Sequence, residues 1–226
     1  MDLPPEHRAR SLAVILGEEG LAPDATLLPP TTPDPGPDGL SALVSTVEVT
    51  LAQTPDVLLI NLSLDDRYPV IQSRAVRAVL RRAWDAGCLP IVAAGNAQHD
   101  LADARDLESG RALQGVPEVQ DPSWLLVGAL HPQSGAAMGT TGPGVHCRHW
   151  GHNVKVPGIR RFSGSSAAAA VVTGLALLLV DGMRAQGQVW TPRSLRDTLA
   201  DPRSQDPHGM PILQRLLTAC GLDAAA

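Results

Sequence analysis

The chain has 226 residues, a formal net charge of −5, 44% apolar residues and 18% charged residues. This length suits one domain with a substantial core, so we expect residues 1–226 to form a single domain. The negative charge and the near absence of Tyr and Phe argue against a surface that follows phosphates or stacks bases. We therefore expect no nucleic-acid partner.

Apolar runs and cysteine usage suggest where the chain resides. The longest apolar run, 167–180, is shorter than the roughly 20 residues of a membrane span. The N-terminal residues lack the long apolar stretch of an export signal. Cys88, Cys147 and Cys220 are odd in number and form no CxxC pair, which favours free thiols. We expect a cytoplasmic protein with no membrane partner.

Short apolar runs alternate with helical patterns along the chain, which is typical of an α/β fold with a parallel sheet covered on both faces. The helix that begins near Ser166 is apolar nearly all round and should pass through the core. The predicted elements are, in order, a helix at 11–17, a Pro-rich loop at 29–39, a helix at 40–53, a strand at 57–62, a helix at 70–86, strands at 89–94 and 124–130, a Gly-rich loop at 135–144, a strand at 153–156, the helix from Ser166, and helices at 192–199 and 211–220.

Three polar residues are candidates for chemistry, each with a structural alternative. Asn96 follows a buried strand that ends in Ala94 and Gly95, where its amide can donate to an oxyanion or simply form a turn. Ser166 opens the apolar helix, where it can act as a nucleophile or cap the helix. His7 precedes a helical stretch and is either a general base or a solvated surface side chain.

The order and spacing of these residues resemble those of the subtilisin-like serine peptidases, the subtilases, over nearly the full chain. The strongest block is SGSSAAAAVVTGLALLL at 163–179, which is similar to the SGTSMAAPHVAG nucleophile motif of that family. Further similar blocks, in chain order, are GLAPDATLLP at 20–29, LINLSLDD at 59–66, PIVAAGN at 90–96, GVPEVQDPSWLLVGAL at 115–130, HWGHNVKVPG at 149–158 and the C-terminal WTPRSLRDTL with HGMPILQRLL. The resemblance implies a subtilisin-like three-layer α/β/α fold with a mostly parallel sheet.

The resemblance also implies roles for individual residues. Ser166 becomes the nucleophile, His7 the general base, and Asn96, with the Ser166 N–H, the oxyanion hole. The implied substrate-binding positions are Ser63, Leu64, Asp65, Ala94 and Gly95.

Departures from the family pattern lie mainly at the N-terminus. The family's catalytic Asp ends a core strand upstream of the histidine, whereas only six residues, including Asp2 and Glu6, precede His7. We therefore expect an N-terminally truncated fold and an incomplete triad. A partner protein can supply the strand and its Asp, because the missing strand leaves a pairing edge.

Two further departures concern the cleft. Asp65 stands where the family has a glycine beside the substrate backbone. Only the segment 159–162 separates the VPG turn from SGSS, where the family has a longer segment. Both changes predict altered or blocked substrate binding.

A histidine-rich segment raises the question of a metal. His146, Cys147, His149 and His152 lie close in sequence, but more tightly spaced than the ligands of a usual structural zinc site. The loop GTTGPG at 139–144 lacks the Lys and the context of a phosphate cradle. We read both segments as structural and expect no metal, calcium included, and no cofactor.

Two functions are compatible with these features. In the first, the chain is a serine endopeptidase domain that cleaves peptide bonds weakly, or only in complex with a partner. Alternatively, it is an inactive pseudo-peptidase that serves as a peptide- or protein-binding subunit. Little activity is expected of the chain alone in either case.

Overall fold

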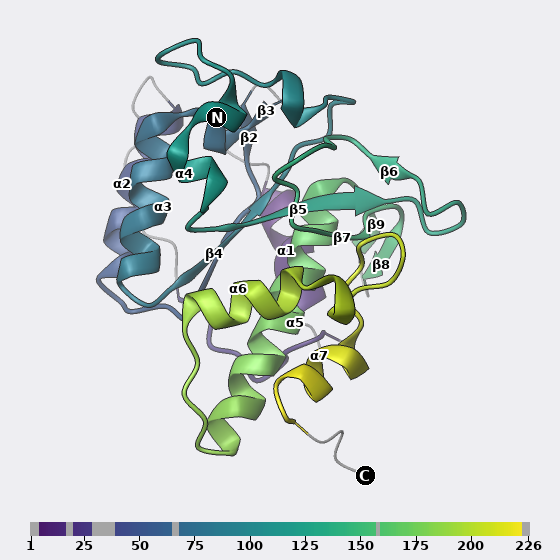
Figure 1. Cartoon of the computed structure of the whole chain (residues 1–226). Coiled ribbons are helices and arrows are strands. Elements are labelled where there is room, and N and C mark those ends of the chain that lie inside the picture. The colour runs from purple at the N-terminus through teal and green to yellow at the C-terminus, as the bar shows by residue number, and fades with distance from the viewer. Residues whose placement is uncertain (1–4, 17–19, 29–38, 65–67, 157–158, 223–226) are drawn as a thin grey trace.

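The structure is a computed structural model that describes residues 5–16, 20–28, 39–64, 68–156 and 159–222 (Figure 1). A sheet forms the middle layer and helices cover both of its faces, as in the predicted α/β/α arrangement. The helices α2 (Gly39–Leu51) and α3 (Arg74–Asp85) pack on one face, while α5 (Ser165–Ala185), α6 (Pro192–Ala200) and α7 (Leu213–Ala219) lie on the other (Figure 1).

The main sheet is mostly parallel, as predicted. Its parallel strands are β1 (Val57–Ile60), β4 (Leu89–Ala93), β5 (Leu125–Leu130) and β7 (Cys147–Trp150), and the short β6 (Ala137–Met138) pairs antiparallel with β5. The strands predicted at 57–62, 89–94 and 124–130 are thereby confirmed. No strand in the described part of the chain pairs with the second edge of β1.

Side chains of the central strands alternate between two cores. Leu89, Ile91 and Ala93 of β4 face the core of α5, α6 and α7, whereas Val92 faces the core of α2 and α3. Because both faces are buried, the strand reads as a continuous apolar run and its period of two is hidden in the sequence.

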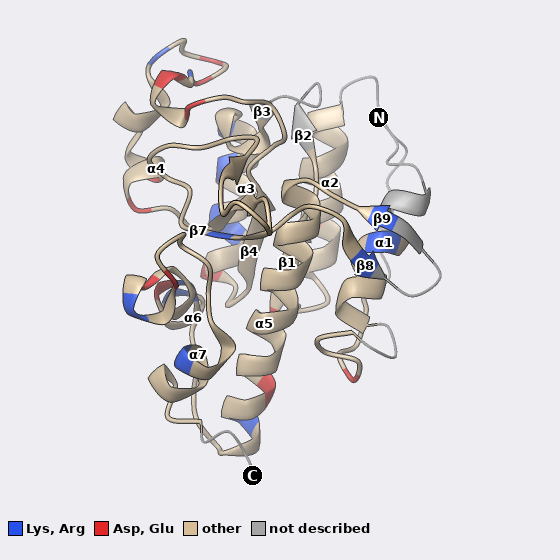
Figure 2. Cartoon of the chain, turned by 90° about the vertical axis from the view of Figure 1, so that its right-hand side faces the viewer, with Lys and Arg blue, Asp and Glu red and all other residues tan. Residues whose placement is uncertain are grey.

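The long helix α5 runs through the interior. Its charged residues, Asp181 and Arg184, lie near its C-terminal end (Figure 2). In the described part of the chain it is the one helix that is long and apolar enough, by length and composition, to cross a membrane, since it has 21 residues and an 18-residue stretch with a mean hydropathy of 1.8. This corrects the expectation that no segment reaches that length. Because 78% of that apolar stretch is buried in the fold, α5 has the character of a core helix.

The helix α1 spans Pro5–Leu16, so the prediction of a helix at 11–17 began too late. Proline suits the first turn of a helix because its missing N–H needs no partner there. Val14 and Ile15 pack with Ala167 and Ala170 of α5. The chain then turns back, with the N–H of Leu21 donating to the Val14 carbonyl at 3.1 Å.

Several short elements differ from the predictions. The predicted helix at 70–86 divides at Ser73 into a 3-10 turn (Val70–Gln72) and α3. Two small antiparallel hairpins were not predicted in full: β2 (Ser63–Leu64) with β3 (Tyr68–Pro69), and β8 (Val154–Val156) with β9 (Ile159–Phe162). The short α4 (Pro117–Gln120) and 3-10 turns at Leu101–Asp103, Leu113–Gly115 and Pro202–Ser204 complete the described elements.

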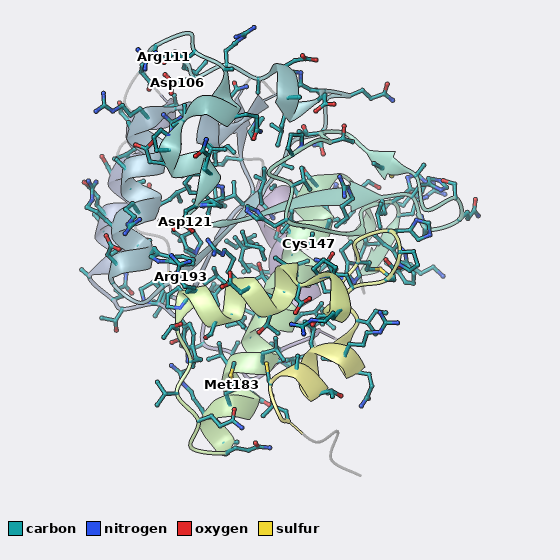
Figure 3. The ribbon with its side chains drawn as sticks, viewed as in Figure 1. Asp106, Arg111, Asp121, Cys147, Met183 and Arg193 are labelled. Atoms are coloured by element: carbon teal, nitrogen blue, oxygen red, sulfur yellow. The ribbon has the colours of Figure 1, made fainter. Side chains whose placement is uncertain are left out.

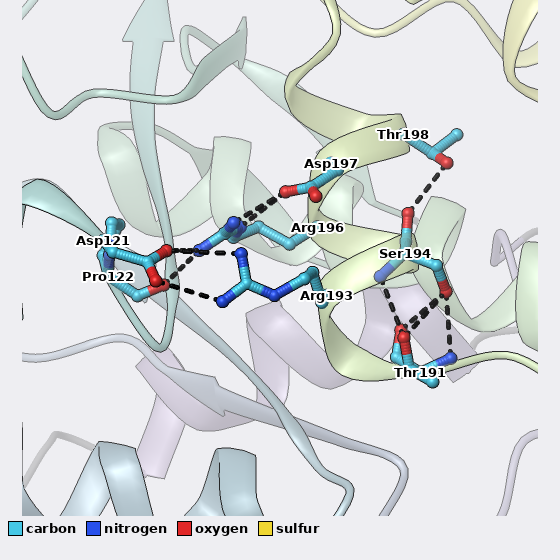
Figure 4. A network of polar contacts seen from close by, with 8 residues as sticks. All are labelled: Asp121, Pro122, Thr191, Arg193, Ser194, Arg196, Asp197 and Thr198. Carbon is cyan, nitrogen blue, oxygen red and sulfur yellow. Dashed lines mark hydrogen bonds and ion pairs between the residues drawn. The ribbon is translucent and has the colours of Figure 1, made fainter.

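Polar contacts fix α6 beside the start of β5 (Figure 4). Thr191 and Ser194 form a capping box at the helix N-terminus. Arg193 donates to Asp121 at 3.0 Å, and Arg196 donates to the Pro122 carbonyl. These bonds tie α6 to the segment that leads into β5.

A buried ion pair fixes the loop above α3. Arg77 donates to Asp106 at 2.5 Å, and the two side chains are only 3% and 5% exposed. Asp106 also accepts from the N–H of Ser109 at 2.7 Å, and its own N–H donates to the Arg111 carbonyl at 2.9 Å (Figure 3). Hydrogen bonds from Ser109, followed by the bond from Arg77, lower the pKa of Asp106 to about 2.

The three cysteines are free thiols, and they should differ in reactivity. Burial raises the pKa values of Cys88 and Cys147 to about 12, whereas Cys220 is partly exposed and its pKa is also raised by burial. Since the thiolate is the reactive form, we expect iodoacetamide to modify Cys220 first in the native protein at neutral pH. Mass spectrometry of tryptic peptides measures this order. Modification of Cys147, labelled in Figure 3, at the rate of Cys220 would contradict the burial of Cys147.

Candidate active site

The N-terminus of α5 is built on a glycine with an unusual backbone. Gly164 precedes the helix with φ of 96° and ψ of −177°, a conformation that is essentially restricted to glycine. Its N–H donates to the Gly151 carbonyl at 2.6 Å, and the N–H of Gly151 donates to the Leu130 carbonyl at 3.0 Å. The turn before the helix is therefore tied to the end of β5, and Ser165 and Ser166 follow in the first helical turn.

Asn96 is held against this helix start by its side-chain oxygen. Its Oδ1 accepts from the N–H of Ser165 at 2.8 Å and from the Ser165 hydroxyl at 3.2 Å. These bonds fix which end of the amide is oxygen, because a backbone N–H can only donate. Among the described residues, none forms a hydrogen bond with the Asn96 Nδ2 group. That group is thus an uncommitted donor beside the first turn of α5.

The segment that carries Asn96 is supported from two sides. The N–H of Gly95 donates to the Ser165 hydroxyl at 3.0 Å. The N–H of Thr140 donates to the Gly95 carbonyl at 3.2 Å, and a side chain on Gly139 would meet that carbonyl at 2.6 Å. The loop 139–144 therefore packs against Gly95 and Asn96, which agrees with its structural interpretation.

Asn61 joins the helix start to α1. Its Nδ2 group donates to the Ser166 carbonyl at 3.2 Å and to the Ser11 hydroxyl at 2.7 Å. Residue 7 lies four positions before Ser11, so the two positions share one face of α1. Position 7 of the α1 backbone is therefore on the same side of the helix as Ser11, which Asn61 links to Ser166. The side chain of His7 lies outside the described residues.

The structure brings together part of the predicted site. Ser166, Asn96, Ala94 and Gly95 meet where β4 ends and α5 begins. Ser63 and Leu64 lie in β2, apart from β1, and their side chains are outside the described residues, as is the whole of Asp65. The assignment of these three to substrate binding stays a prediction.

Two residues of the site were not singled out from the sequence. Ser165 supplies the contacts with Asn96, and Asn61 connects Ser166 with α1. Both lie inside quoted blocks, SGSS and LINLSLDD, so a signal existed. Their role depends on contacts between segments up to 105 residues apart, which no local pattern shows.

The histidine-rich segment has structural partners. His146 Nδ1 accepts from the Leu126 N–H at 2.8 Å, and His149 Nδ1 accepts from the Trp150 N–H at 2.9 Å. Burial lowers the pKa of each imidazole to about 4, with Arg196 adding to the effect at His146. Cys147 is part of the core. In the described ranges, no three His, Cys, Asp or Glu side chains converge as metal ligands would.

The fold resembles those of solved subtilisin-like structures. The protease domain of PatA matches at a TM-score of 0.72 and 18% identity, over 96% of this chain and 80% of that one. The prenylagaramide maturation protease PagA matches at a TM-score of 0.73 and 18% identity, over 96% of this chain and 83% of that one. The PatG macrocyclase, solved with a peptide, matches at a TM-score of 0.67 and 18% identity, over 95% of this chain and 68% of that one. At this identity the likeness establishes a subtilisin-like α/β fold.

Family membership follows from the sequence comparison. The Subtilase family model matches residues 13–210, most of the chain. The protein therefore belongs to the subtilase family, as its motifs predicted. No curated protein matches it.

Proposed function

We propose that this chain is a serine peptidase domain in which Ser166 is the nucleophile. The observation that supports the proposal is the position of Asn96, whose Oδ1 is bound to Ser165 while Nδ2 has no partner within the described residues. A donor fixed beside a helix N-terminus suits an oxyanion, because both the amide and the helix end favour negative charge.

The proposed reaction begins with attack of the Ser166 hydroxyl oxygen on a peptide carbonyl carbon. His7 accepts the hydroxyl proton, and the carbonyl oxygen becomes an oxyanion between Asn96 Nδ2 and the Ser166 N–H. The imidazolium then gives the proton to the leaving amine, which departs as the acyl-enzyme forms. Water hydrolyses the acyl-enzyme by the same steps in reverse order.

The residues assigned to this reaction do not include the carboxylate that orients the histidine in a complete triad. Loss of that carboxylate alone lowers turnover by roughly four orders of magnitude in triad enzymes. We therefore propose little proteolysis by the chain alone and a partner protein that supplies a strand with an Asp. The second edge of β1 suits such a strand, since it pairs with no strand in the described ranges.

The geometry of β1 indicates where that Asp would stand. β1 ends at Ile60, next to Asn61, which contacts both Ser166 and Ser11. Carboxyl ends of parallel strands meet at one edge of a sheet. A strand added parallel to β1 would thus end beside α1, the helix that carries His7. We propose this assembly for a cytoplasmic setting.

A fluorophosphonate probe tests the proposal, because it labels only activated serines. We expect slow labelling of the isolated chain, loss of labelling in Ser166→Ala and His7→Ala, and faster labelling of Ser166 in fractionated cell lysate. Ser134→Ala, which removes an exposed turn hydroxyl, is the matched control and should label like wild type. Labelling that survives in Ser166→Ala would contradict the assignment of the nucleophile.

A pseudo-peptidase that binds peptides is the second candidate. It is favoured by the shortness of the segment between VPG and SGSS, which consists only of β9 and ends at Phe162, immediately before SGSS. The likeness to PatG, solved with a peptide, makes a peptide the ligand we propose in either case. Absence of labelling both alone and in lysate would favour this candidate, with Ser166 reduced to a structural residue.

A further inference from the structure

A surface pocket of about 590 Å3 lies at the outer edge of β7, in a part of the molecule that shares no residue with the nucleophile site. Its walls come from β7, from the segment after α6 and from α7. Its lining includes Arg148, Gln205, Asp206, His208, Gly209 and Arg215.

Arg148 reaches this pocket from β7. Its backbone N–H donates to the Gly209 carbonyl at 2.8 Å, and its Cγ would lie 3.3 Å from a side chain placed on Gly128. The strand and the loop therefore fix the base of the side chain. Its Nε is buried and has no hydrogen-bond partner, and within the described residues the guanidinium forms no ion pair. The buried Nε is itself out of reach of a ligand, but a guanidinium without a carboxylate partner can donate from its terminal nitrogens to an acceptor in the pocket.

Arg215 supplies a second guanidinium from α7. Its Nη1 donates to the Gln205 carbonyl at 2.5 Å. Gln205 is itself buried, and its Nε2 donates to the Leu199 carbonyl at 2.9 Å. The carbonyl that Arg215 contacts therefore belongs to a residue anchored to the end of α6, while Arg215 as a whole is exposed.

The charges of the pocket select the charge of a ligand. Among the described residues, Asp206 is the one carboxylate that lines the pocket. Its Oδ1 accepts from the N–H groups of His208 and Met210, each at 2.9 Å, so it is engaged with its own loop. The formal charges of two arginines and one aspartate sum to a single positive charge. A monoanion balances that charge, whereas a dianion would leave the filled pocket with a net negative charge.

We propose that this pocket binds a carboxylate group of a peptide, either an acidic side chain or a free C-terminus. Two guanidiniums on different elements match the two oxygens of a carboxylate. A nucleic-acid ligand fits less well, because the chain has a net charge of −5. The pocket does not depend on hydrolysis at Ser166, so it would serve a peptidase or a pseudo-peptidase alike.

Fluorescence anisotropy on the Ser166→Ala variant tests this proposal without cleavage of the probe. The probes are labelled, acetylated and amidated Gly-Gly-Glu-Gly-Gly, the same peptide with Gln in place of Glu, and the Gln peptide with a free C-terminus. We expect the Gln peptide with the amidated C-terminus, which has no carboxylate, to bind at least about tenfold more weakly than a probe that carries one. The probe that binds identifies the source of the carboxylate. Raising the salt concentration should weaken that binding.

Variants locate the binding. Arg148→Gln and Arg215→Gln should each weaken binding of the carboxylate probe by about tenfold. Arg215→Gln is the safer test of the two, since this side chain is exposed and its loss does not open the core. Arg81→Gln removes the same charge from α3 and should change nothing. Equal binding of all three probes, wild-type binding by Arg215→Gln, or tighter competition by inorganic phosphate than by acetate would overturn the proposal.

Discussion

Replacing Arg77 by Met is expected to lower the free energy of unfolding by about 3–5 kcal/mol, because it leaves the buried Asp106 carboxylate without its counter-ion. The substitution also removes hydrogen bonds from Arg77 to the carbonyls of Ile71 at 2.8 Å and Gln72 at 3.0 Å. Urea unfolding at neutral pH measures the change.

The matched control for this prediction is Arg81→Met on the same helix. Arg81 pairs with Asp85, but both side chains are 58% exposed. Exposed pairs contribute about 0–1 kcal/mol, so this variant should unfold almost like wild type. Equal losses in the two variants would mean that Met disturbs α3 for reasons unrelated to the buried pair.

The pH dependence of the difference provides an independent check. The pKa of Asp106 is lowered from 3.8 to about 2, so its contribution to stability is complete above pH 3.8 and disappears as the pH falls through about 2. The difference in the free energy of unfolding between wild type and Arg77→Met should therefore become smaller in acid. A constant difference down to pH 2 would contradict an ionic origin.

Replacing Gly164 by Ala is expected to cost about 2–4 kcal/mol of stability and to abolish fluorophosphonate labelling. The new Cβ would lie 2.5 Å from Asn96 Oδ1, and φ at this position is +96°. Asn96 must then move, and its bonds with Ser165 break. Thermal unfolding measures the first effect, and the labelling rate tests the proposed role of Asn96.

Gly187→Ala is the control that separates the effect of backbone strain from the effect of the contact between the new Cβ and Asn96. Gly187 follows the C-terminal end of α5 with φ of +69°, and nothing lies within 4 Å of an added Cβ. Its substitution should cost about 1–2 kcal/mol from strain alone and leave labelling unchanged. If Gly164→Ala behaved in the same way, the contact with Asn96 would not matter.

The sequence predicts an element well where the whole element is buried and its residues are therefore continuously apolar. The strand at 89–94 is continuously apolar because both of its faces are covered, and α5 is apolar because it lies in the interior. β7 was missed because Cys147–Trp150 contains Arg and His and gives no apolar run. Its pairing with β5 is a tertiary contact, and it depends on residues about twenty positions away.

The candidate site shows the same division. Asn96 and Ser166 were predicted as separate motifs, and only the family resemblance placed them together. The physical link is Ser165, whose hydroxyl and N–H join the end of β4 to the start of α5. A serine at a helix start is a common cap, so its sequence signal does not reveal that use.

The docking of α1 has a consequence for the order of folding. In synthesis from the N-terminus α1 is made before α5, which holds its packing partners, and the contact of Asn61 with Ser166 joins residues 105 positions apart. Contacts of such long sequence separation slow folding, because a large loop must close before any contact is gained. The helix that carries His7 should therefore dock late, and a nascent chain that ends before α5 should leave α1 open to proteases and chaperones.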